Sequence, residues 1–311
     1  MKEGCAFPVV SAHLLDELLP FADAVEILTA AFRGDRAEAP LRVALEVPGG
    51  QLLLMPAHGP EGVGVKLVTV TPDNPAAGRP LVQGIYVLFS PDGLTPELMI
   101  DGAALTARRT AAVSALATDR LARSDAHELV VFGAGRQARA HVEAMRAVRP
   151  IDSVAIVGRD RCRAEELVQE LRADGELHAQ LAGVEAVSDA DIVCTCTTSR
   201  VPLFDDRLLP AGVHVNAIGA YRPDMRELPG ATLTRALIVV ESPEAALAEA
   251  GDLIQAIAEG AIDAGQIYAD LTDLATGRIT RTDHDQVTVF KSVGIASEDL
   301  VLARALCDYL S

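Results

Sequence analysis

Apolar positions follow one pattern in the first third of the chain. Short runs rich in β-branched residues are separated by turn clusters, which is typical of antiparallel strands. Such runs occupy 42–47, 51–54, 63–71 and 84–90. A helical pattern at 22–32 precedes them, and an Ala-rich helical stretch at 105–121 follows. This third therefore predicts an α+β unit with an antiparallel sheet.

A second pattern begins at residue 128, where short apolar strands alternate with helices. The expected strands are 128–132, 153–157, 191–196, 213–217, 237–240 and 287–290, and the first two helices are 136–148 and 161–173. Such alternation forms βαβ units with a parallel sheet. A last helix follows, with Ser297 as its expected N-cap and with Glu298 and Asp299 in its first turn. We expect this helix to pack back on the first domain.

The bulk composition excludes several classes of protein. The chain has 311 residues, of which 50% are hydrophobic and 23% charged, ordinary values for a globular protein of two domains. Its formal net charge of −17 opposes binding to nucleic acid or to an anionic membrane, because both require a broad basic surface. Apolar runs stay far below the ~18 residues of a membrane helix, and the first residues lack the apolar core of a secretory signal. We expect a cytoplasmic protein that binds neither nucleic acid nor membranes.

The cysteine pattern predicts neither disulfides nor a metal site. Five cysteines are present, with no CxxC pair and no histidine at zinc-finger spacing. They are Cys5, Cys162, Cys194, Cys196 and Cys307, and we expect all five to be reduced thiols. Cys194 and Cys196 would share one face of a strand, which leaves a metal pair open, although small buried core residues are the simpler interpretation. We predict no metal.

A glycine turn after the strand 128–132 has the features of a dinucleotide-binding site. The turn and the start of the following helix read Gly133, Ala134, Gly135, Arg136, Gln137 and Ala138. The first glycine permits a tight turn, the second lets the backbone approach a pyrophosphate, and Ala138 lets helix and strand pack closely. The motif alone is weak evidence, but its place at the start of a βαβ run supports a nicotinamide dinucleotide.

The end of the next strand bears on the choice between NADP and NAD. An acid there binds the ribose hydroxyls of NAD, whereas an arginine accommodates the extra phosphate of NADP. Arg159 comes first, Asp160 follows, and Arg161 and Arg163 are close behind. Seven arginines against three acids lie between 136 and 163 in this otherwise acidic chain. The sequence favours NADP and leaves NAD open because of Asp160.

Two lysines, Lys66 and Lys291, lie in apolar stretches of the sequence, where a charge needs an anionic partner. Lysine occurs at only three positions, Lys2, Lys66 and Lys291. Lys66 shares a strand face with Val68 and Val70, so it either reaches solvent or meets an anion, and we expect a substrate contact. Lys291 is ambiguous and fits a structural role better.

Arg109 shares a helical stripe with Val113 and Leu116. A guanidinium on such a stripe suits a carboxylate, which it grips through two parallel hydrogen bonds. An internal ion pair across the domain is the alternative. Arg42 has no persuasive spacing of its own.

These segments together resemble the ornithine cyclodeaminase and mu-crystallin family. The resembling blocks, in chain order, are 55–57, 66–70, 109–112, 133–138, 215–219 and 289–294. Six ordered blocks over nearly the whole chain are far more specific than the glycine turn. The resemblance implies an α/β fold in which a Rossmann-type parallel-sheet domain, residues 125–295, is inserted in a discontinuous α+β substrate and dimerisation domain, residues 1–124 completed by 296–311.

The resemblance also implies a homodimer, formed through the sheet of the discontinuous domain, and a substrate held between the two domains. Carried over by motif, Arg42, Lys66 and Arg109 would grip the carboxylate of a small amino-acid-derived substrate. Besides the glycine turn from Gly133 to Gln137 and Arg159, we predict cofactor contacts in the segments that follow later strands. These contacts are Thr195, Ile218 and Val293.

Two departures from the family pattern narrow the range of activities that the resemblance allows. Ornithine cyclodeaminases carry an acid two positions before Met-Pro, where this chain has Leu53. They and the family's alanine dehydrogenases also have an Asp soon after the glycine at 219, where this chain has Tyr221. The stretch 222–228 instead resembles mu-crystallin and the imine reductases. Without both acids, deamination of a diamine loses its general base and its ammonium partner.

The resemblance and these departures predict an NAD(P)H-dependent reductase of a cyclic ketimine carboxylate, of the pyrroline- or piperideine-2-carboxylate kind, that yields the cyclic amino acid. An iminium carbon is already electrophilic, so the reaction needs chiefly orientation in a dry site. Three alternatives stay open: ornithine cyclodeamination with Asp224 in place of the missing acid, an alanine-type amino-acid dehydrogenase, and a non-catalytic protein that binds NADPH or a small carboxylate. Tyr221 is the remaining candidate, either as a proton donor or as a lining residue.

Overall fold

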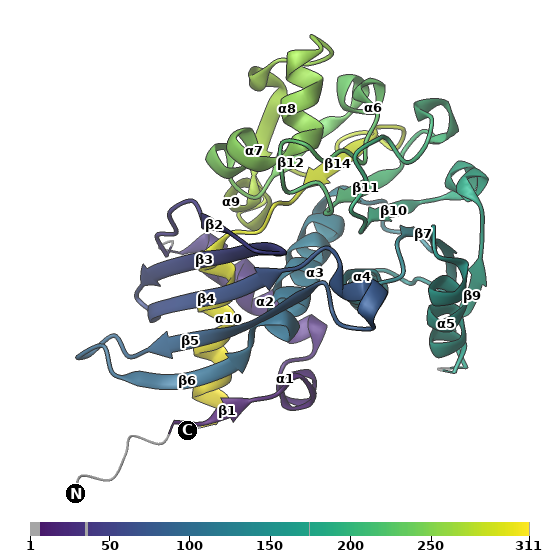
Figure 1. The fold of residues 1–311 in the computed structure, drawn as a ribbon. Coiled ribbons are helices and arrows are strands. Elements are labelled where there is room, and N and C mark those ends of the chain that lie inside the picture. The colour runs from purple at the N-terminus through teal and green to yellow at the C-terminus, as the bar shows by residue number, and fades with distance from the viewer. Residues whose placement is uncertain (1–6, 35–36, 174, 311) are drawn as a thin grey trace, which may run out of the picture. The chain divides into compact units, whose positions relative to one another are not determined.

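Two compact units make up the protein, whose computed structural model describes residues 7–34, 37–173 and 175–310. Unit 1 combines Met1–Arg109 with Ile295–Ser311, and unit 2 is Thr110–Gly294. The chain leaves unit 1 within helix α3 (Gly102–Leu121) and returns to it just before helix α10 (Ala296–Tyr309), as Figure 1 shows. Unit 1 is therefore assembled from both ends of the chain.

The described part of unit 1 contains a six-stranded sheet, with the strand order β1-β6-β5-β4-β3-β2. Its strands are β1 (Val9–Val10), β2 (Val43–Val47), β3 (Gly50–Gly59), β4 (Gly62–Val70), β5 (Val82–Phe89) and β6 (Pro96–Asp101). Neighbours from β2 to β6 are antiparallel, while β1 and β6 are parallel. The predicted antiparallel sheet is confirmed. The apolar pattern missed β1 and β6, and it predicted β3 too short.

Strand alternation decides which side chains of β4 are buried. The residues at 62, 64, 66, 68 and 70 are buried, and the intervening ones are partly or fully exposed. Helix α10 packs on β3 and β4, and α2 (Phe21–Arg33) packs on α10 (Figure 1). A short helix, α1 (Ala12–Leu18), also contacts α10. Because of this packing, the side chain of Lys66 lies on the buried face of the sheet.

Eight parallel strands form the sheet in the described part of unit 2, in the order β13-β12-β14-β11-β10-β7-β8-β9. They are β7 (Glu128–Phe132), β8 (Ser153–Val157), β9 (His178–Leu181), β10 (Ile192–Thr195), β11 (His214–Ala217), β12 (Leu237–Val240), β13 (Ile267–Asp270) and β14 (Thr288–Lys291). The chain proceeds from β7 outward to β9 and then returns to the other side of β7 at β10. Ligands of open α/β sheets bind at the carboxyl edge beside such a reversal.

Helices connect these strands and complete the α/β unit. They are α4 (Arg136–Val148), α5 (Arg161–Arg172), α6 (Gly230–Arg235), α7 (Pro243–Glu249), α8 (Gly251–Ala258) and α9 (Leu271–Ala275). Short 3-10 helices are η1 (Asn74–Ala77) in unit 1, and η2 (Val184–Asp189), η3 (Asp206–Leu208) and η4 (Ala264–Gln266) in unit 2. The predicted Rossmann-type α/β fold is confirmed. Within the described residues, no helix has the length and apolar character of a membrane span.

The start of α10 differs from the prediction. Its N-cap is Ile295 rather than Ser297, and no side chain caps the helix. The backbone has already turned at Gly294, whose φ is 82°, so Ser297 lies inside the first turn and is buried. Glu298 and Asp299 do lie in the first turn, but both are fully buried. A favourable interaction with the helix dipole therefore does not by itself account for these two buried carboxylates.

Candidate active site

The glycine turn lies where the strand order of unit 2 reverses. β7 ends at Phe132, and Gly133 turns the chain with a φ of 112°, in the left-handed region that favours glycine. A Cβ on Gly133 would lie 2.6 Å from the carbonyl oxygen of Cys196, just beyond the neighbouring strand β10. Both the backbone conformation and this close approach therefore require glycine at position 133.

Gly135 has a different reason to be glycine. It is the N-cap of α4 and provides no side-chain acceptor for the first-turn amides, which also lack intrahelical partners. A Cβ at this position would meet no protein atom within 4 Å, so the packing of the chain does not require glycine. The amides and the helix dipole together form a site for an anion. These residues fit a dinucleotide whose diphosphate lies against the turn.

Two arginines beside this turn, Arg136 and Arg159, are exposed and have no ionic partner among the described residues. Arg136 is the first residue of α4, and Arg159 follows β8. Asp160 is occupied as the N-cap of α5, where its carboxylate accepts a backbone N–H at 3.2 Å. Arg161 is occupied too, since it pairs with Glu165 at 3.1 Å. Of the charged groups that follow β8, Arg159 is thus available to an added phosphate.

The predicted cofactor residues of unit 2 lie at the ends of five adjacent strands. Val293 follows β14, Ile218 follows β11, Thr195 ends β10, Gly133 follows β7 and Arg159 comes after β8. Because parallel strands end at the same edge of a sheet, these residues line one edge of the unit. Their contacts with a dinucleotide stay a prediction.

A buried carboxylate joins the ends of β10 and β11. Glu227 accepts hydrogen bonds from Thr195 Oγ1 at 2.8 Å, from the N and Oγ1 of Thr197 at 2.7 Å, and from Gly219 N at 2.6 Å. Burial raises the pKa of Glu227, and the charge of Lys291 opposes the rise. Four donors to one fully buried carboxylate hold both loops in place, so Glu227 positions the segments that carry Thr195 and Ile218.

Glu241 has the same function at the end of β14. Its carboxylate accepts from Ser292 Oγ at 2.5 Å, from Val293 N at 3.0 Å and from Gly294 N at 2.5 Å. It is 1% exposed. The third predicted strand-end residue, Val293, is thus held by a buried acid as well.

Lys291 stabilises the same region from the interior of unit 2. Its Nζ lies 3.1 Å from Asp252 Oδ2 and donates to the carbonyl oxygen of Ala217 at 3.1 Å. The other oxygen of Asp252 accepts the backbone N–H groups of Glu227 and Leu228 at 2.7 and 2.9 Å. This arrangement connects β14, β11 and α8, which supports the structural interpretation of Lys291.

In unit 1, Lys66 is 1% exposed and does not reach solvent. Its Nζ lies 2.8 Å from Asp299 Oδ2 and 3.0 Å from Oδ1. Burial, and after it the charges of Arg109 and Arg42, lower the pKa of Lys66 from 10.5 to about 8, although Asp299 opposes the change. The three predicted carboxylate-binding residues are therefore close enough to act on one another. The three cations Lys66, Arg109 and Arg42 outnumber the two buried carboxylates, Asp299 and Glu298, that pair with the first two.

Arg109 is 4% exposed and takes part in the internal ion pair that the sequence left open. Its Nη1 lies 2.9 Å from Glu298 Oε2, and its Nε lies 3.6 Å from Asp299 Oδ1. Both acids come from the first turn of α10. The pairing orients the guanidinium and does not by itself exclude a further carboxylate, because a guanidinium carries five N–H donors.

Tyr221 lies in unit 2, in the loop after β11, and is half-buried. Its backbone N–H donates to the carbonyl oxygen of Gly219 at 3.1 Å. Asp224, the conceivable substitute for the missing acid of cyclodeaminases, pairs with Arg222 at 2.9 Å and with Arg200 at 3.1 Å on the surface. These ion pairs oppose a role for Asp224 as the ligand of a substrate amine.

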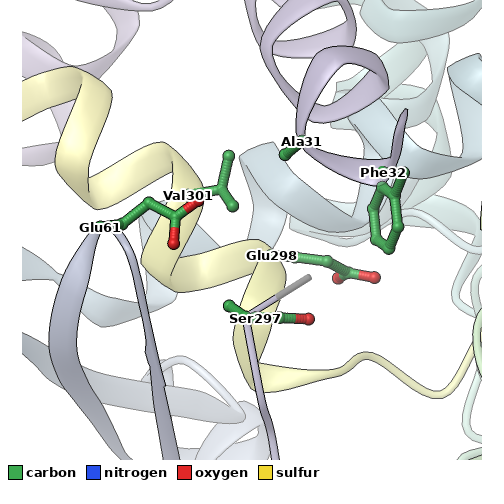
Figure 2. A pocket seen from close by; sticks show the side chains of 7 residues that line it. Ala31, Phe32, Glu61, Ser297, Glu298 and Val301 are labelled. Atoms are coloured by element: carbon green, nitrogen blue, oxygen red, sulfur yellow. The ribbon is translucent and has the colours of Figure 1, made fainter. Parts of the chain in front are cut away.

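A small pocket in unit 1 adjoins the carboxylate of Glu298. Its lining residues are Ala31, Phe32, Ala37, Glu61, Ser297, Glu298 and Val301. Figure 2 shows Ser297 and Glu298 extending from α10 towards Phe32, with Glu61 and Val301 at the opposite side. The pocket encloses about 20 Å³, which accommodates one water molecule and is too small for a cyclic amino acid. We therefore do not assign the substrate to this pocket.

The cysteines of the described chain are buried or partly buried thiols, apart from the exposed Cys162. Burial raises the pKa of Cys194 to about 12, so this thiol stays protonated. Within the described residues, no group of three His, Cys, Asp or Glu side chains is arranged to hold a metal ion. Cys5 lies outside the described residues.

Five acids with at most 1% exposure were not predicted to be buried. They are Glu227, Glu241, Asp252, Glu298 and Asp299. A fully buried acid is rare and needs a partner. The only local signal was the acidic pair at the start of the last helix, and the helix dipole explains such a pair equally well. The packing of α10 on the sheet was needed to show that these acids point inward.

Comparisons with known proteins extend these observations. The model of the Ornithine cyclodeaminase/mu-crystallin family matches residues 9–311. A Delta(1)-pyrroline-2-carboxylate reductase of Bacillus cereus is 37% identical over 310 residues, which cover 96% of this chain and 95% of the relative. The likeness thus spans both units.

Two solved structures have the same fold over nearly their full length. A Thermococcus litoralis Delta(1)-pyrroline-2-carboxylate reductase, in complex with NADH and L-proline, has a TM-score of 0.93 and 32% identity, with 97% and 96% of the two chains covered. An archaeal alanine dehydrogenase dimer with bound NAD has a TM-score of 0.90 and 29% identity, with 97% and 95% covered. The resemblance inferred from six short motifs is confirmed: the chain belongs to the ornithine cyclodeaminase/mu-crystallin family.

Proposed function

We propose that this protein is an NAD(P)H-dependent reductase of a cyclic ketimine carboxylate, of the pyrroline-2-carboxylate type, which it converts to the cyclic amino acid. The observation that carries the proposal is the buried pair of cations in unit 1, Lys66 and Arg109, with Arg42 nearby. With Arg42 included, three cations lie near two buried acids, Asp299 and Glu298, and such an excess of positive charge suits a small carboxylate. The likeness to pyrroline-2-carboxylate reductases over the whole chain supports this substrate class.

The proposed reduction requires no strong base from the protein. When bound, the nicotinamide supplies a hydride to the imine carbon, and the dinucleotide is thereby oxidised. The π electrons of the C=N bond pass to nitrogen, which holds the proton of the iminium form. Arg109 and Lys66 bind the substrate carboxylate, and Arg42 adds to the positive potential. Fixing the carboxylate fixes the orientation of the ring, which is the main requirement of this step.

The position where cyclodeaminases carry an acid supports a reductase. Leu53 is 5% exposed and packs in an apolar cluster with Val68 and Val70. An ammonium group has no carboxylate partner in such a cluster, so binding the side-chain amine of ornithine would be costly. A cyclic imine has no second amine and meets no such cost.

Initial rates test the function directly. We expect oxidation of NADPH in the presence of pyrroline-2-carboxylate, and no ammonia from L-ornithine with NAD. Ammonia from ornithine without imine reduction would establish a cyclodeaminase instead. NADH oxidation with pyruvate and ammonia would establish an alanine-type dehydrogenase, and tight NADPH binding without turnover on any of these substrates would favour a binding protein.

We propose that NADP is preferred over NAD, through Arg159. Its exposed guanidinium follows β8 and has no ionic partner among the described residues, whereas Asp160 is occupied as a helix cap. Arg159→Ala should raise the KM for NADPH about tenfold and leave the KM for NADH unchanged, because one charge-assisted contact to phosphate is lost. The matched control is Arg161→Ala, which removes an exposed arginine already paired with Glu165. Equal KM values for both coenzymes in the wild type would contradict the preference.

We further propose a homodimer formed through the sheet of unit 1. Every residue of the edge strand β2 is exposed, including Val43, Leu45 and Val47 at 52%, 47% and 41%. An exposed apolar edge strand pairs readily with another chain. The likeness to an alanine dehydrogenase described as a dimer agrees with this arrangement. Light scattering should give twice the chain mass for the wild type and the chain mass for Leu45→Lys.

A further inference from the structure

We propose that Asp299 is a positioning residue for the substrate: its carboxylate holds the Lys66 ammonium and the Arg109 guanidinium together, so that both act on one substrate carboxylate. The inference rests on the proposed function, because it concerns the same binding site. It assigns a role to an acid that local sequence explains as a helix-dipole residue.

Asp299 contacts both cations although they come from different elements. Lys66 lies on β4 and is held at 2.8 and 3.0 Å by the two carboxylate oxygens of Asp299. Arg109 lies on α3, and its Nε is 3.6 Å from Oδ1 of the same carboxylate. Asp299 itself lies in the first turn of α10 and is fully buried. One acid on a third element thus sets the separation of two cations.

The charges around Lys66 explain why this acid is needed. Arg109 on α3 and Arg42 before β2 both repel the ammonium. Tyr86 on β5 lies opposite Lys66 in the sheet. Burial, and after it the charge of Asp299, raise the pKa of Tyr86, so its hydroxyl stays neutral. Asp299 is the group whose charge opposes the loss of the Lys66 proton. Without it, Lys66 would become neutral near physiological pH and would bind a carboxylate poorly.

Glu298 provides a matched control because it shares the burial and the helical turn of Asp299 but differs in the cation with which it makes its shortest ion pair. Both acids are fully buried in the first turn of α10. Glu298 pairs with Arg109, at 2.9 Å. A guanidinium stays charged over the whole accessible pH range, whereas a buried lysine titrates. Removing the charge of Glu298 therefore disturbs orientation, while removing that of Asp299 also changes protonation.

The first experiment follows the Lys66 proton itself, in the full-length protein labelled with carbon-13 at lysine Cε. The chain has only three lysines, so Lys66→Met identifies the signal. We expect Asp299→Asn to lower the Lys66 pKa by about 1 to 3 pH units, the effect of losing an adjacent opposite charge. Glu298→Gln should lower it much less. This readout requires no catalytic activity and separates a failure of the inference from a failure of the proposed function.

The second experiment measures substrate recognition. In Asp299→Asn, the fall of kcat/KM at alkaline pH should move to lower pH by the same interval as the Lys66 pKa, whereas in Glu298→Gln the KM should rise without such a move. The affinity for L-proline, measured by calorimetry with NADP⁺ present, should fall at least about tenfold in Asp299→Asn. The conservative variant Asp299→Glu should leave the alkaline limb, the fall of kcat/KM at high pH, where it is in the wild type, and should raise KM.

The inference is overturned if Asp299→Asn leaves the Lys66 pKa and the alkaline limb unchanged. It is also overturned if Asp299→Glu, with the charge retained, moves the alkaline fall of kcat/KM to lower pH by about one unit or more, the smallest shift expected from loss of the charge. The second outcome stays measurable even when the asparagine variant does not fold. A wild type that neither reduces the imine nor binds L-proline would overturn the proposed function and, with it, the substrate role of Asp299.

Discussion

Lys66 in unit 1 and Lys291 in unit 2 are alike in burial and in local setting, and they differ in the charges around them. Each lies in a strand, is 1% exposed and pairs with a buried aspartate, at 2.8 and 3.1 Å. The guanidinium groups of Arg109 and Arg42 both repel Lys66, and Glu298 pairs with Arg109. Lys291 instead donates to a backbone carbonyl and lies near the carboxylate of Glu227.

This difference distinguishes the proposed substrate-binding residue, Lys66, from a structural one, Lys291. Surplus positive charge around a buried lysine attracts an anionic ligand, whereas a lysine surrounded by acceptors has its charge already satisfied. Burial of a lysine therefore says little about its role until the sign of the neighbouring charge is known. Substitutions at the two lysines and at the groups around them test this contrast.

The largest expected effect belongs to Lys66→Met, which keeps the side-chain volume and removes the charge. We expect kcat/KM for pyrroline-2-carboxylate to fall about a thousandfold, because a buried charged contact to the substrate carboxylate is worth several kcal/mol. Steady-state kinetics at a temperature where circular dichroism shows the variant folded provide the check. A folded variant with less than a tenfold loss would remove Lys66 from the site.

Lys291→Met should act on stability instead. Asp252 would then be buried without its cation, which costs about 3–5 kcal/mol. Urea denaturation should show this loss, and kcat/KM of the folded variant should stay within a few-fold of the wild type. Adding Asp252→Asn should recover part of the stability, since the unpaired charge is removed. If Lys291→Met impaired catalysis as strongly as Lys66→Met, the contrast between the two lysines would be wrong.

Acid should destabilise unit 2 through two buried histidines. Burial lowers the pKa of His141 to about 4 and that of His214 to about 3 from the usual 6.5. Below pH 6.5 the unfolded chain binds protons that the folded chain does not, so stability falls as pH decreases from about 6.5 towards 4. Each histidine contributes about 1.4 kcal/mol per pH unit in this window.

Urea denaturation at pH 7, 6 and 5 measures this dependence, and His141→Gln should reduce its slope by about half. The described histidines of unit 1, His13 and His58, are exposed at 84% and 60%, so His13→Gln serves as the control and should leave the slope unchanged. An unchanged slope in His141→Gln would show that other groups govern the acid sensitivity.

The smallest effect is expected for Glu227→Gln, at the carboxyl edge of unit 2. The amide presents an NH₂ group to donors that need an acceptor, so the loops after β10 and β11 lose part of their support. We expect the Kd for NADPH, from a fluorescence titration, to rise about tenfold. Asp224→Asn, at an exposed acid of the same segment, should leave Kd unchanged. A lower melting temperature with an unaltered Kd would limit Glu227 to a structural role.

The sequence by itself determined the features that depend on a few neighbouring residues. The strand, the glycine turn and the helix around Gly133 follow from local patterns, and β4 exposes alternate residues as predicted, which placed Lys66 among apolar side chains. The order of six motifs over the whole chain was sufficient to identify the family. These features could be predicted because backbone conformation and strand periodicity are set within a few residues.

Only the tertiary structure decided which charges meet. Asp299 is 233 residues from Lys66, and Glu298 is 189 residues from Arg109. At Arg159 and Asp160 the sequence favoured NADP and left NAD open, and only the structure shows that the aspartate caps a helix. An acid in the first turn of a helix is locally stable whether it faces solvent or the interior. Its direction is set by the packing of the whole helix against a sheet formed far away in the chain, and no local pattern contains that information.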